Sequence, residues 1–146
     1  MRIKNCRNCK NPKFIKLFSL GNQSFTGKFT PKKIKVKKGL LNLIMCSKCN
    51  LIQLAHNYDL NYMYGPDYGY RTGMNKTMTN HVFNVSETLS NKVNLSKNDI
   101  VLDIASNDGT LLNSYKSKSL KFAIDPLVNK YKDNYKKINY KVSDFF

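Results

Sequence analysis

The four cysteines constrain this chain more than any other feature of its sequence. They form two Cys-x-x-Cys pairs, Cys6 with Cys9 and Cys46 with Cys49, and no cysteine is left over. Each pair has the spacing at which a tight turn directs two thiolates to one ion, and two such pairs complete a tetrahedral zinc site. Because four protein ligands leave no position for a catalytic water, we expect the zinc to be structural.

Two other roles for the cysteine pairs fit less well. Disulfides are typical of exported proteins, but the residues after Met1 lack the apolar stretch of a secretory signal. A redox motif would occur once, at a strand-to-helix turn, and not as a matched pair. No apolar run approaches the roughly 18 residues of a membrane span. We therefore expect a cytoplasmic protein with no membrane partner.

The residues around the cysteines have the pattern of short strands. Apolar stretches at 14–18, 41–45 and 51–56 predict strands. The turns between them are predicted from glycine and proline, at Gly21, Gly27, Pro31 and Gly39. We expect a zinc ribbon over residues 1–56. Its apolar content is too small to hold it folded, so the metal should dominate its stability.

The net charge is strongly positive. The 146 residues include 25 Lys and Arg against 9 Asp and Glu, a formal charge of +16, which first suggests nucleic acid. The lysines, however, are spread along the chain and are dense only at 32–38. Arginine, which nucleic-acid surfaces favour for its bidentate geometry, occurs only as Arg2, Arg7 and Arg71. We favour a solvated lysine surface, and a nucleic-acid-binding zinc ribbon is the alternative function.

A tyrosine-rich segment and a helix are predicted over residues 57–95. Glycines and a proline argue against a regular element in 57–75. Its tyrosines, including Tyr68 and Tyr70, could stack on a base, take part in acid–base chemistry or simply pack a loop. After residue 75 an apolar stripe predicts a helix, at Met78, Val82, Val85, Leu89 and Val93. His81 lies beside this stripe without a second histidine at metal spacing, so we expect no metal there.

Residues 96–146 alternate between strands and helices. Strands are predicted at 99–105, 121–124 and 138–142, with helices from Thr110 and over 127–135. This βαβαβ order is the opening half of a doubly wound, Rossmann-like sheet. The predicted fold class is therefore α+β, a zinc ribbon followed by the start of a parallel sheet.

Acidic residues mark the expected carboxyl ends of the first two strands, where such sheets bind nucleotides. Asp125 follows Asp103 by 22 residues, at a position from which a carboxylate can accept hydrogen bonds from both ribose hydroxyls. The loop after the first strand departs from the dinucleotide-binding motif G-x-G-x-x-G, because it contains only one glycine, Gly109. Asp103 and Asp108 would repel a pyrophosphate but suit the cationic groups of S-adenosylmethionine. An ordinary turn without a ligand is the alternative.

Together these segments resemble the S-adenosylmethionine-dependent sugar C-methyltransferases that carry an N-terminal zinc-binding domain. The similarity spans almost the whole chain, and its pieces come in the family's order. They are the two cysteine pairs, Leu20-Gly21-Asn22-Gln23 with Phe25, Leu51-Ile52-Gln53-Leu54, residues 68–78 with His81, residues 101–112, and Ile124-Asp125-Pro126.

The resemblance implies methyl transfer to a carbon next to the ketone of a nucleotide-linked deoxy-keto-sugar. A base removes a proton, and the enolate attacks the methyl group of S-adenosylmethionine. The implied cofactor-binding residues are Asp103, Ala105, Ser106, Asn107, Asp108 and Gly109 at the methionine end, Asp125 at the ribose and Asp144 near the adenine. Tyr68 and Tyr70 match the family's tyrosine motif and are the implied catalytic residues.

The sequence departs from the family at two points. Ala105 stands where the family usually has glycine, which tightens the approach of the backbone to the cofactor. The chain also stops at Phe146, where only three of about seven strands of such a sheet can be placed. The resemblance implies the N-terminal part of a longer enzyme, inactive by itself, with the base beyond residue 146. It leaves open the sugar, the methylated carbon and the oligomeric state. We expect residues 99–146 in isolation to be marginally stable and prone to associate.

Overall fold

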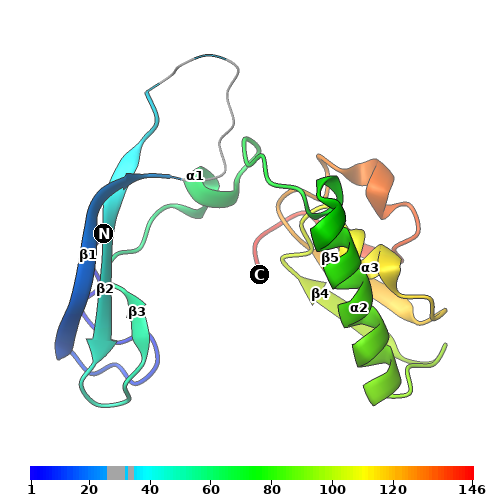
Figure 1. The fold of residues 1–146 in the computed structure, drawn as a ribbon, viewed down its shortest axis with the longest axis horizontal. Helices are drawn as coiled ribbons and strands as arrows, with labels where there is room; N and C mark the ends of the chain where they lie inside the picture. The colour runs from blue at the N-terminus through cyan, green and yellow to red at the C-terminus, as the bar shows by residue number, and fades with distance from the viewer. Residues whose placement is uncertain (26–31, 33–34) are drawn as a thin grey trace. The chain divides into compact units, whose positions relative to one another are not determined.

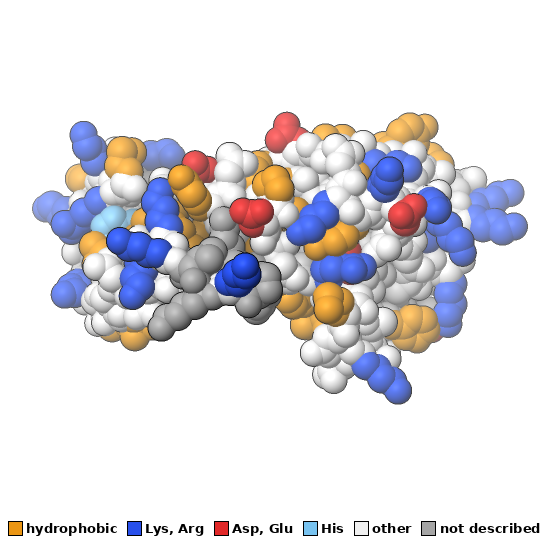
Figure 2. All heavy atoms as spheres, turned by 90° about the horizontal axis from the view of Figure 1, so that it is seen from above, with side chains coloured by type: hydrophobic (Ala, Val, Ile, Leu, Met, Phe, Trp, Pro, Cys, Tyr) orange, Lys and Arg blue, Asp and Glu red, His pale blue; other side chains and the backbone are white. Residues whose placement is uncertain are grey.

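The computed structural model describes residues 1–25, 32 and 35–146, and the chain forms two compact units, Met1–Tyr68 and Gly69–Phe146 (Figure 1). The turns expected at Gly27 and Pro31, and part of the lysine run at 32–38, lie outside the described residues. Within the described ranges, no helix has the length and apolar character needed to cross a membrane. Lys and Arg side chains are scattered over the visible surface, among few Asp and Glu (Figure 2).

The first unit contains an antiparallel sheet of short strands, as the sequence predicted. Its strands are β1 (Phe14–Ser24), β2 (Lys38–Cys46) and β3 (Ile52–Leu54), in the order β1-β2-β3. Gly21 was expected to end the first strand, but β1 continues through it. The backbone of Gly21 has φ +66°, and the register shifts between Ser19 and Asn22. This glycine therefore permits a bulge within the strand and does not terminate it.

A second glycine of this sheet is needed for close packing. Gly39 lies in β2, and a Cβ atom added to it would stand 2.6 Å from the ring of Tyr58. The Tyr58 hydroxyl donates a hydrogen bond to the carbonyl of Leu40 at 2.7 Å, which holds the ring over the strand. The predicted turn at Gly39 is therefore wrong, because the residue is part of the strand on which an aromatic ring rests.

The tyrosine segment contains regular structure, contrary to the expectation for residues 57–75. A short helix, α1 (Leu60–Tyr64), begins after Asp59, whose side chain accepts the N–H of Asn61 at 2.9 Å. The amide of Gly65 donates to the Asn61 carbonyl at 3.1 Å and ends the helix. A 3₁₀ turn, η1 (Thr72–Met74), follows. The acidic cap at the start and the glycine at the end stabilise one helical turn that the glycine and proline content did not indicate.

The second unit is built on a three-stranded parallel sheet. Its strands are β4 (Ile100–Ile104), β5 (Leu120–Ile124) and β6 (Tyr140–Val142), in the order β4-β5-β6. The helix α3 (Thr110–Ser114) connects β4 to β5, and the 3₁₀ turn η2 (Lys132–Tyr135) lies between β5 and β6. The three predicted strands and the helix after the first are confirmed, with boundaries shifted by one or two residues.

The predicted helix over residues 127–135 is wrong. The Asp125 carboxylate accepts the N–H of Leu127 at 2.7 Å, and the backbone bonds that follow alternate between three-residue and four-residue spacing. This alternation gives turns and the short η2 in place of a continuous helix. Leu127, Val128 and Tyr135 of this segment are nevertheless buried.

The helix α2 (Lys76–Lys92) is confirmed and packs against α3. It begins at Asn75, whose side chain accepts the N–H of Met78 at 3.1 Å. The apolar stripe is only half-buried at Val82 and Val85, and Leu89 is exposed. The stripe therefore predicted the helix correctly but not the depth of its burial.

The two faces of the parallel sheet differ in their covering. One face packs on a core of Leu112, Ala123, Val128, Tyr135 and Ile138. On β4 and β6, apolar side chains are between 46% and 63% exposed, at Ile100, Leu102, Ile104, Tyr140 and Val142. In β4 the burial alternates along the strand, so these side chains share one face of that strand.

Candidate metal centre and candidate cofactor loop

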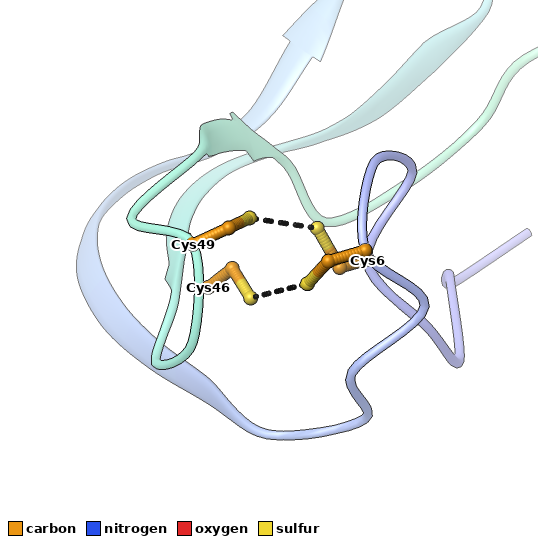
Figure 3. A group of neighbouring side chains, drawn as sticks. Cys6, Cys46 and Cys49 are labelled. Carbon is orange, nitrogen blue, oxygen red and sulfur yellow. Dashed lines mark hydrogen bonds between the residues drawn. The ribbon is translucent and has the colours of Figure 1, made fainter.

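The four cysteines converge on one point in the first unit. Their four Sγ atoms lie within 4.8 Å of one another. Cys6 and Cys49 have their sulfurs 3.7 Å apart, and those of Cys9 and Cys46 are 3.5 Å apart (Figure 3). Sulfurs at the corners of a tetrahedron around zinc, with bonds of about 2.3 Å, are separated by about 3.8 Å. The cysteines thus already have the geometry that a four-thiolate zinc ion requires.

Both cysteine pairs are held by the same kind of turn. The amide of Lys10 donates to the Cys6 carbonyl at 3.1 Å, and the amide of Asn50 donates to the Cys46 carbonyl at 3.0 Å. Lys10 and Asn50 also share a left-handed backbone, with φ of 61° and 58°. The matched spacing in the sequence therefore corresponds to matched local structure, in which each turn directs its two thiols to the centre.

Two amide side chains near the sulfurs were not identified from the sequence. Gln53 donates from Nε2 to the Cys6 sulfur at 3.3 Å, and Asn11 donates from Nδ2 to the Cys46 sulfur at 3.5 Å. The Gln53 Oε1 in turn accepts from the Arg7 guanidinium at 3.2 Å. Gln53 is a polar residue in the otherwise apolar run at 51–54, and this was the sequence signal by which it could have been identified. Such partners orient the ligands of a metal and favour their charged form.

The electrostatics of the centre favour a thiolate at Cys46, whereas the pKa of Cys9 is raised to about 11, because the hydrogen bond from the Asn11 backbone is outweighed by burial and the neighbouring sulfurs. Hydrogen bonds from backbone amides, first that of Cys49, outweigh burial and lower the pKa of the Cys46 thiol to about 6. Such bonds compensate negative charge on the sulfur. The donor set of four sulfurs with surrounding N–H groups fits zinc, whose structural sites are closed by four protein ligands.

In the second unit, the predicted cofactor residues gather at the carboxyl edge of the parallel sheet. The loop at 105–109 follows β4, and Asp125 follows β5. The amides of Ala105 and Ser106 donate to the Ile124 carbonyl at 2.9 and 3.3 Å. The Asp125 carboxylate accepts the N–H of Asn107 at 2.9 Å. The ends of the first two strands are thereby joined by direct hydrogen bonds.

The backbone of this loop has an unusual conformation at the alanine that departs from the family pattern. Ala105, Asn107 and Gly109 have φ of 62°, 54° and 76°. A left-handed backbone costs glycine no steric energy, costs asparagine little and is strained for alanine. The family that the sequence resembles usually has glycine at the position of Ala105. In this structure Ala105 also adopts dihedral angles that suit glycine.

One acidic residue of this edge is influenced by another. Asp103 is half-buried on β4, and burial, followed by the charge of Asp125, raises the pKa of Asp103 to about 6. A carboxylate pair of this kind favours an approaching cation, because a positive charge relieves the mutual repulsion. Asp144 is exposed beyond the end of β6, where its carboxylate accepts the N–H of Phe145 at 2.7 Å.

The carboxylate of Asp108 is fully enclosed and already engaged. It accepts the amide of Gly73 at 3.0 Å and the hydroxyl of Thr110 at 2.6 Å, and it lies 3.5 Å from Nε of Arg71. A Cβ atom added to Gly73 would stand 2.7 Å from the Thr110 hydroxyl. The residue expected to face the cofactor's cation instead binds the segment that precedes α2, so its direct contact with the cofactor stays a prediction.

Asn107 also forms hydrogen bonds to the segment that precedes α2. Its Oδ1 accepts the amide of Thr72 at 2.9 Å, and its Nδ2 donates to the carbonyl of Tyr70 at 3.2 Å. Beneath the loop, the hydroxyls of Ser106 and Tyr135 lie 2.9 Å apart, and Tyr135 donates to the Asn107 carbonyl at 2.9 Å. The sequence placed Thr72 only within the resembling stretch 68–78 and gave Tyr135 no role at the loop, because Tyr135 forms no motif by spacing.

The two candidate catalytic tyrosines belong to different units. Tyr68 lies at the end of the first unit, half-buried, with its ring edge-on to that of Tyr64 at 5.4 Å between centroids. Tyr70 lies in the second unit, and its side chain is exposed. Their catalytic roles stay predictions.

Comparison with known proteins identifies the first unit more closely. A methyltransferase-associated family model with the description "Putative zinc binding domain" matches residues 6–64. This range contains all four cysteines and lies within the first unit. No curated protein matches the chain. The chain therefore carries a zinc-binding module of the kind found in methyltransferases, and its four cysteines are the metal site of that module.

Proposed function

We propose that this chain is the zinc-binding and cofactor-binding part of an S-adenosylmethionine-dependent C-methyltransferase. The observation that carries the proposal is the pairing, on one chain, of a methyltransferase-type zinc module with an acidic loop at the carboxyl edge of a parallel sheet. Parallel sheets of the doubly wound kind bind their ligands at this edge. The substrate proposed from the family resemblance is a nucleotide-linked deoxy-keto-sugar, methylated next to its ketone.

The order and register of the second unit support a Rossmann-like assignment. Sequential parallel strands with helical connections, β4-α3-β5-η2-β6, are the pattern of one half of such a sheet. The loop after the first strand has left-handed residues, which give it the tight turn common between a strand and a helix at ligand-binding edges. An acidic residue follows the second strand, at the position that binds ribose in nucleotide-binding sheets.

The proposed roles divide the reaction between groups of residues. Zinc supplies structural stability to the first unit through Cys6, Cys9, Cys46 and Cys49. The cofactor, when bound, supplies a methyl group on a cationic sulfur. Asp103 and the loop at 105–109 would hold its methionine end, Asp125 its ribose and Asp144 its adenine. Tyr68 and Tyr70 would act on the sugar, with a phenol hydroxyl donating a hydrogen bond to the enolate oxygen.

Calorimetric titration of the zinc-loaded chain with S-adenosylhomocysteine tests this proposal. We expect saturable binding that Asp125→Asn weakens about tenfold to a hundredfold, because a charge-assisted hydrogen bond to the ribose contributes roughly 1.5–3 kcal/mol. Asp133→Asn is the matched control, since this exposed carboxylate on η2 pairs with Lys136. Absence of binding, or equal affinities of wild type and Asp125→Asn, would contradict the proposed cofactor site.

A further inference from the structure

A cavity of about 250 Å³ opens on the first unit between four segments of chain, namely the N-terminal segment, β1, β2 and the residues after β3. Its apolar lining is Leu40, Ile44 and Ala55, and its polar lining includes Arg2, Lys16 and His56. We call it the Arg2/His56 pocket. Its volume lies just below the range of about 300–1,000 Å³ typical of pockets for small molecules. The pocket is therefore suited to a small ligand or to one group of a larger ligand.

The walls of this pocket are held in place by the fold. Ile44 and Ala55 are 7% and 3% exposed, and the amide of Ala55 donates to the Asn42 carbonyl at 2.9 Å. The N-terminal segment joins them through an antiparallel bridge between Arg2 and His56 and through the amide of Ile3, which donates to the Ala55 carbonyl at 2.9 Å. The pocket is thus formed before any ligand arrives.

The polar groups around the pocket favour an anion. Within the described part of the chain, the side chains of Arg2 and Lys16 have no hydrogen-bond or ion-pair partner, and no carboxylate lines the pocket. Nδ1 of His56 is shielded from solvent and also lacks a partner. A shielded polar atom without a partner is costly, and the exposed cations of Arg2 and Lys16 are the groups to which an anion can bind.

The charge of the whole unit adds to this local arrangement. Residues 1–68 contain 13 Lys and Arg against 2 Asp and Glu, a formal charge of +11. Even a zinc ion with four thiolates, which together contribute a charge of −2, leaves the unit strongly positive. A field of this sign attracts anions toward any basic concavity on the unit.

We propose that the Arg2/His56 pocket binds the phosphate group of a small phosphate ester. Phosphate presents several acceptor oxygens to a planar guanidinium and an ammonium group, and the aliphatic lining accommodates the ester carbon. A phosphate group carries a charge of about −1.5 to −2 near neutral pH, and so matches the two cationic side chains better than a carboxylate of charge −1. The inference is independent of the proposed methyl transfer, since it concerns the first unit alone.

The test uses inorganic pyrophosphate and a nucleoside diphosphate with the zinc-loaded chain in 0.15 M salt, followed by two-dimensional amide NMR. We expect saturable shifts at residues 2, 16 and 55–56. Arg2→Gln and Lys16→Gln should each weaken binding at least fivefold, and His56→Phe should weaken it while keeping an aromatic ring beside Tyr58. Arg2 and Lys16 are exposed, so their substitution should leave the fold intact.

Lys13→Gln is the matched control, because it removes the same charge from an exposed position of the same unit that does not line the pocket. Unchanged affinity in this control supports the pocket. Equal losses in Lys13→Gln and Lys16→Gln, or no saturable shifts with either phosphate probe, would overturn it. A single-stranded oligonucleotide provides a further test. The proposal would be overturned in favour of a diffuse nucleic-acid surface if the oligonucleotide bound more tightly than the nucleoside diphosphate, with a steep salt dependence and equal loss of affinity on substitution of any lysine.

Discussion

The two units of this chain achieve stability by different physical means. In the described part of the first unit, the buried apolar residues are Cys6, Ile44, Cys46 and Ala55, and two of these are metal ligands. The second unit buries Leu112, Tyr115, Ala123, Leu127, Val128, Tyr135 and Ile138. The first unit also carries a formal charge of +11, against +5 from 12 Lys and Arg and 7 Asp and Glu in residues 69–146. A unit with so small a core and so much like charge needs its metal, whereas the second has an ordinary hydrophobic core.

The largest expected effect is the loss of one zinc ligand. Cys46→Ser should abolish stoichiometric zinc binding and unfold residues 1–68, because zinc in small modules contributes about 10–16 kcal/mol of apparent binding energy that is also folding energy. Elemental analysis and amide NMR measure both outcomes. Lys48→Ser, an exposed position in the same turn, should retain one zinc per chain. A folded first unit in zinc-free Cys46→Ser would show that the metal is dispensable.

The second unit should respond to its own core and not to zinc. Leu112→Ala removes a fully buried side chain of α3 and should destabilise this unit by about 2–5 kcal/mol. Urea denaturation followed by NMR signals of β4 and β5 measures this change. Leu111→Ala, at a half-buried neighbouring position, should lower the free energy of unfolding by less. If zinc affinity fell together with the stability of Leu112→Ala, the two units would not be energetically separate.

The acidic loop should depend on Asp108 through its attachment to the segment before α2. Asp108→Ala leaves the Gly73 amide and the Arg71 guanidinium without their acceptor, which should cost about 1–3 kcal/mol. Amide hydrogen exchange at Gly73 should accelerate in this variant and remain slow in Asp99→Ala, which removes an exposed carboxylate of the same unit. Equal exchange at Gly73 in wild type and Asp108→Ala would mean that other contacts hold the segment.

The smallest effect, of opposite sign, is expected at the strained alanine. Ala105→Gly should stabilise the second unit by about 0.5–1 kcal/mol. The strain energy that is removed from the left-handed alanine exceeds the free-energy cost of the greater conformational entropy of glycine in the unfolded chain. Ala123→Gly, at a buried position of β5 without positive φ, should destabilise it. Thermal unfolding measures both variants, and a lower midpoint for Ala105→Gly would contradict the assigned strain.

The sequence predicted most of what depends on spacing. The cysteine cluster, the strands around it, the α2 helix and the three parallel strands with the helix after the first follow from local spacing and periodicity, and the structure confirms them. It did not predict what depends on particular side-chain contacts. Asp59 begins a helix in a segment rich in glycine, and residues 127–135 form turns and the short η2 in place of the expected helix.

The same distinction holds within the candidate site. The loop at 105–109 and Asp125 were expected to share one edge, because carboxyl ends of parallel strands meet there, and hydrogen bonds join them. The engagement of Asp108 by Gly73 could not be foreseen, because the partners are 35 residues apart in sequence. Gln53 and Asn11 were missed beside the sulfurs because they lie 47 and 35 residues from the cysteines they contact, and only Gln53 leaves a local signal, as a polar residue in an apolar run.

Residue-resolved amide hydrogen exchange of the whole chain, with and without a zinc chelator, tests most directly the claim that metal and core stabilise separate units. We predict that chelation removes the protection of amides in β1, β2 and β3 and leaves those in β4, β5 and α2 unchanged. Retained protection in β1–β3 without zinc, or a joint loss of protection in both units, would contradict it.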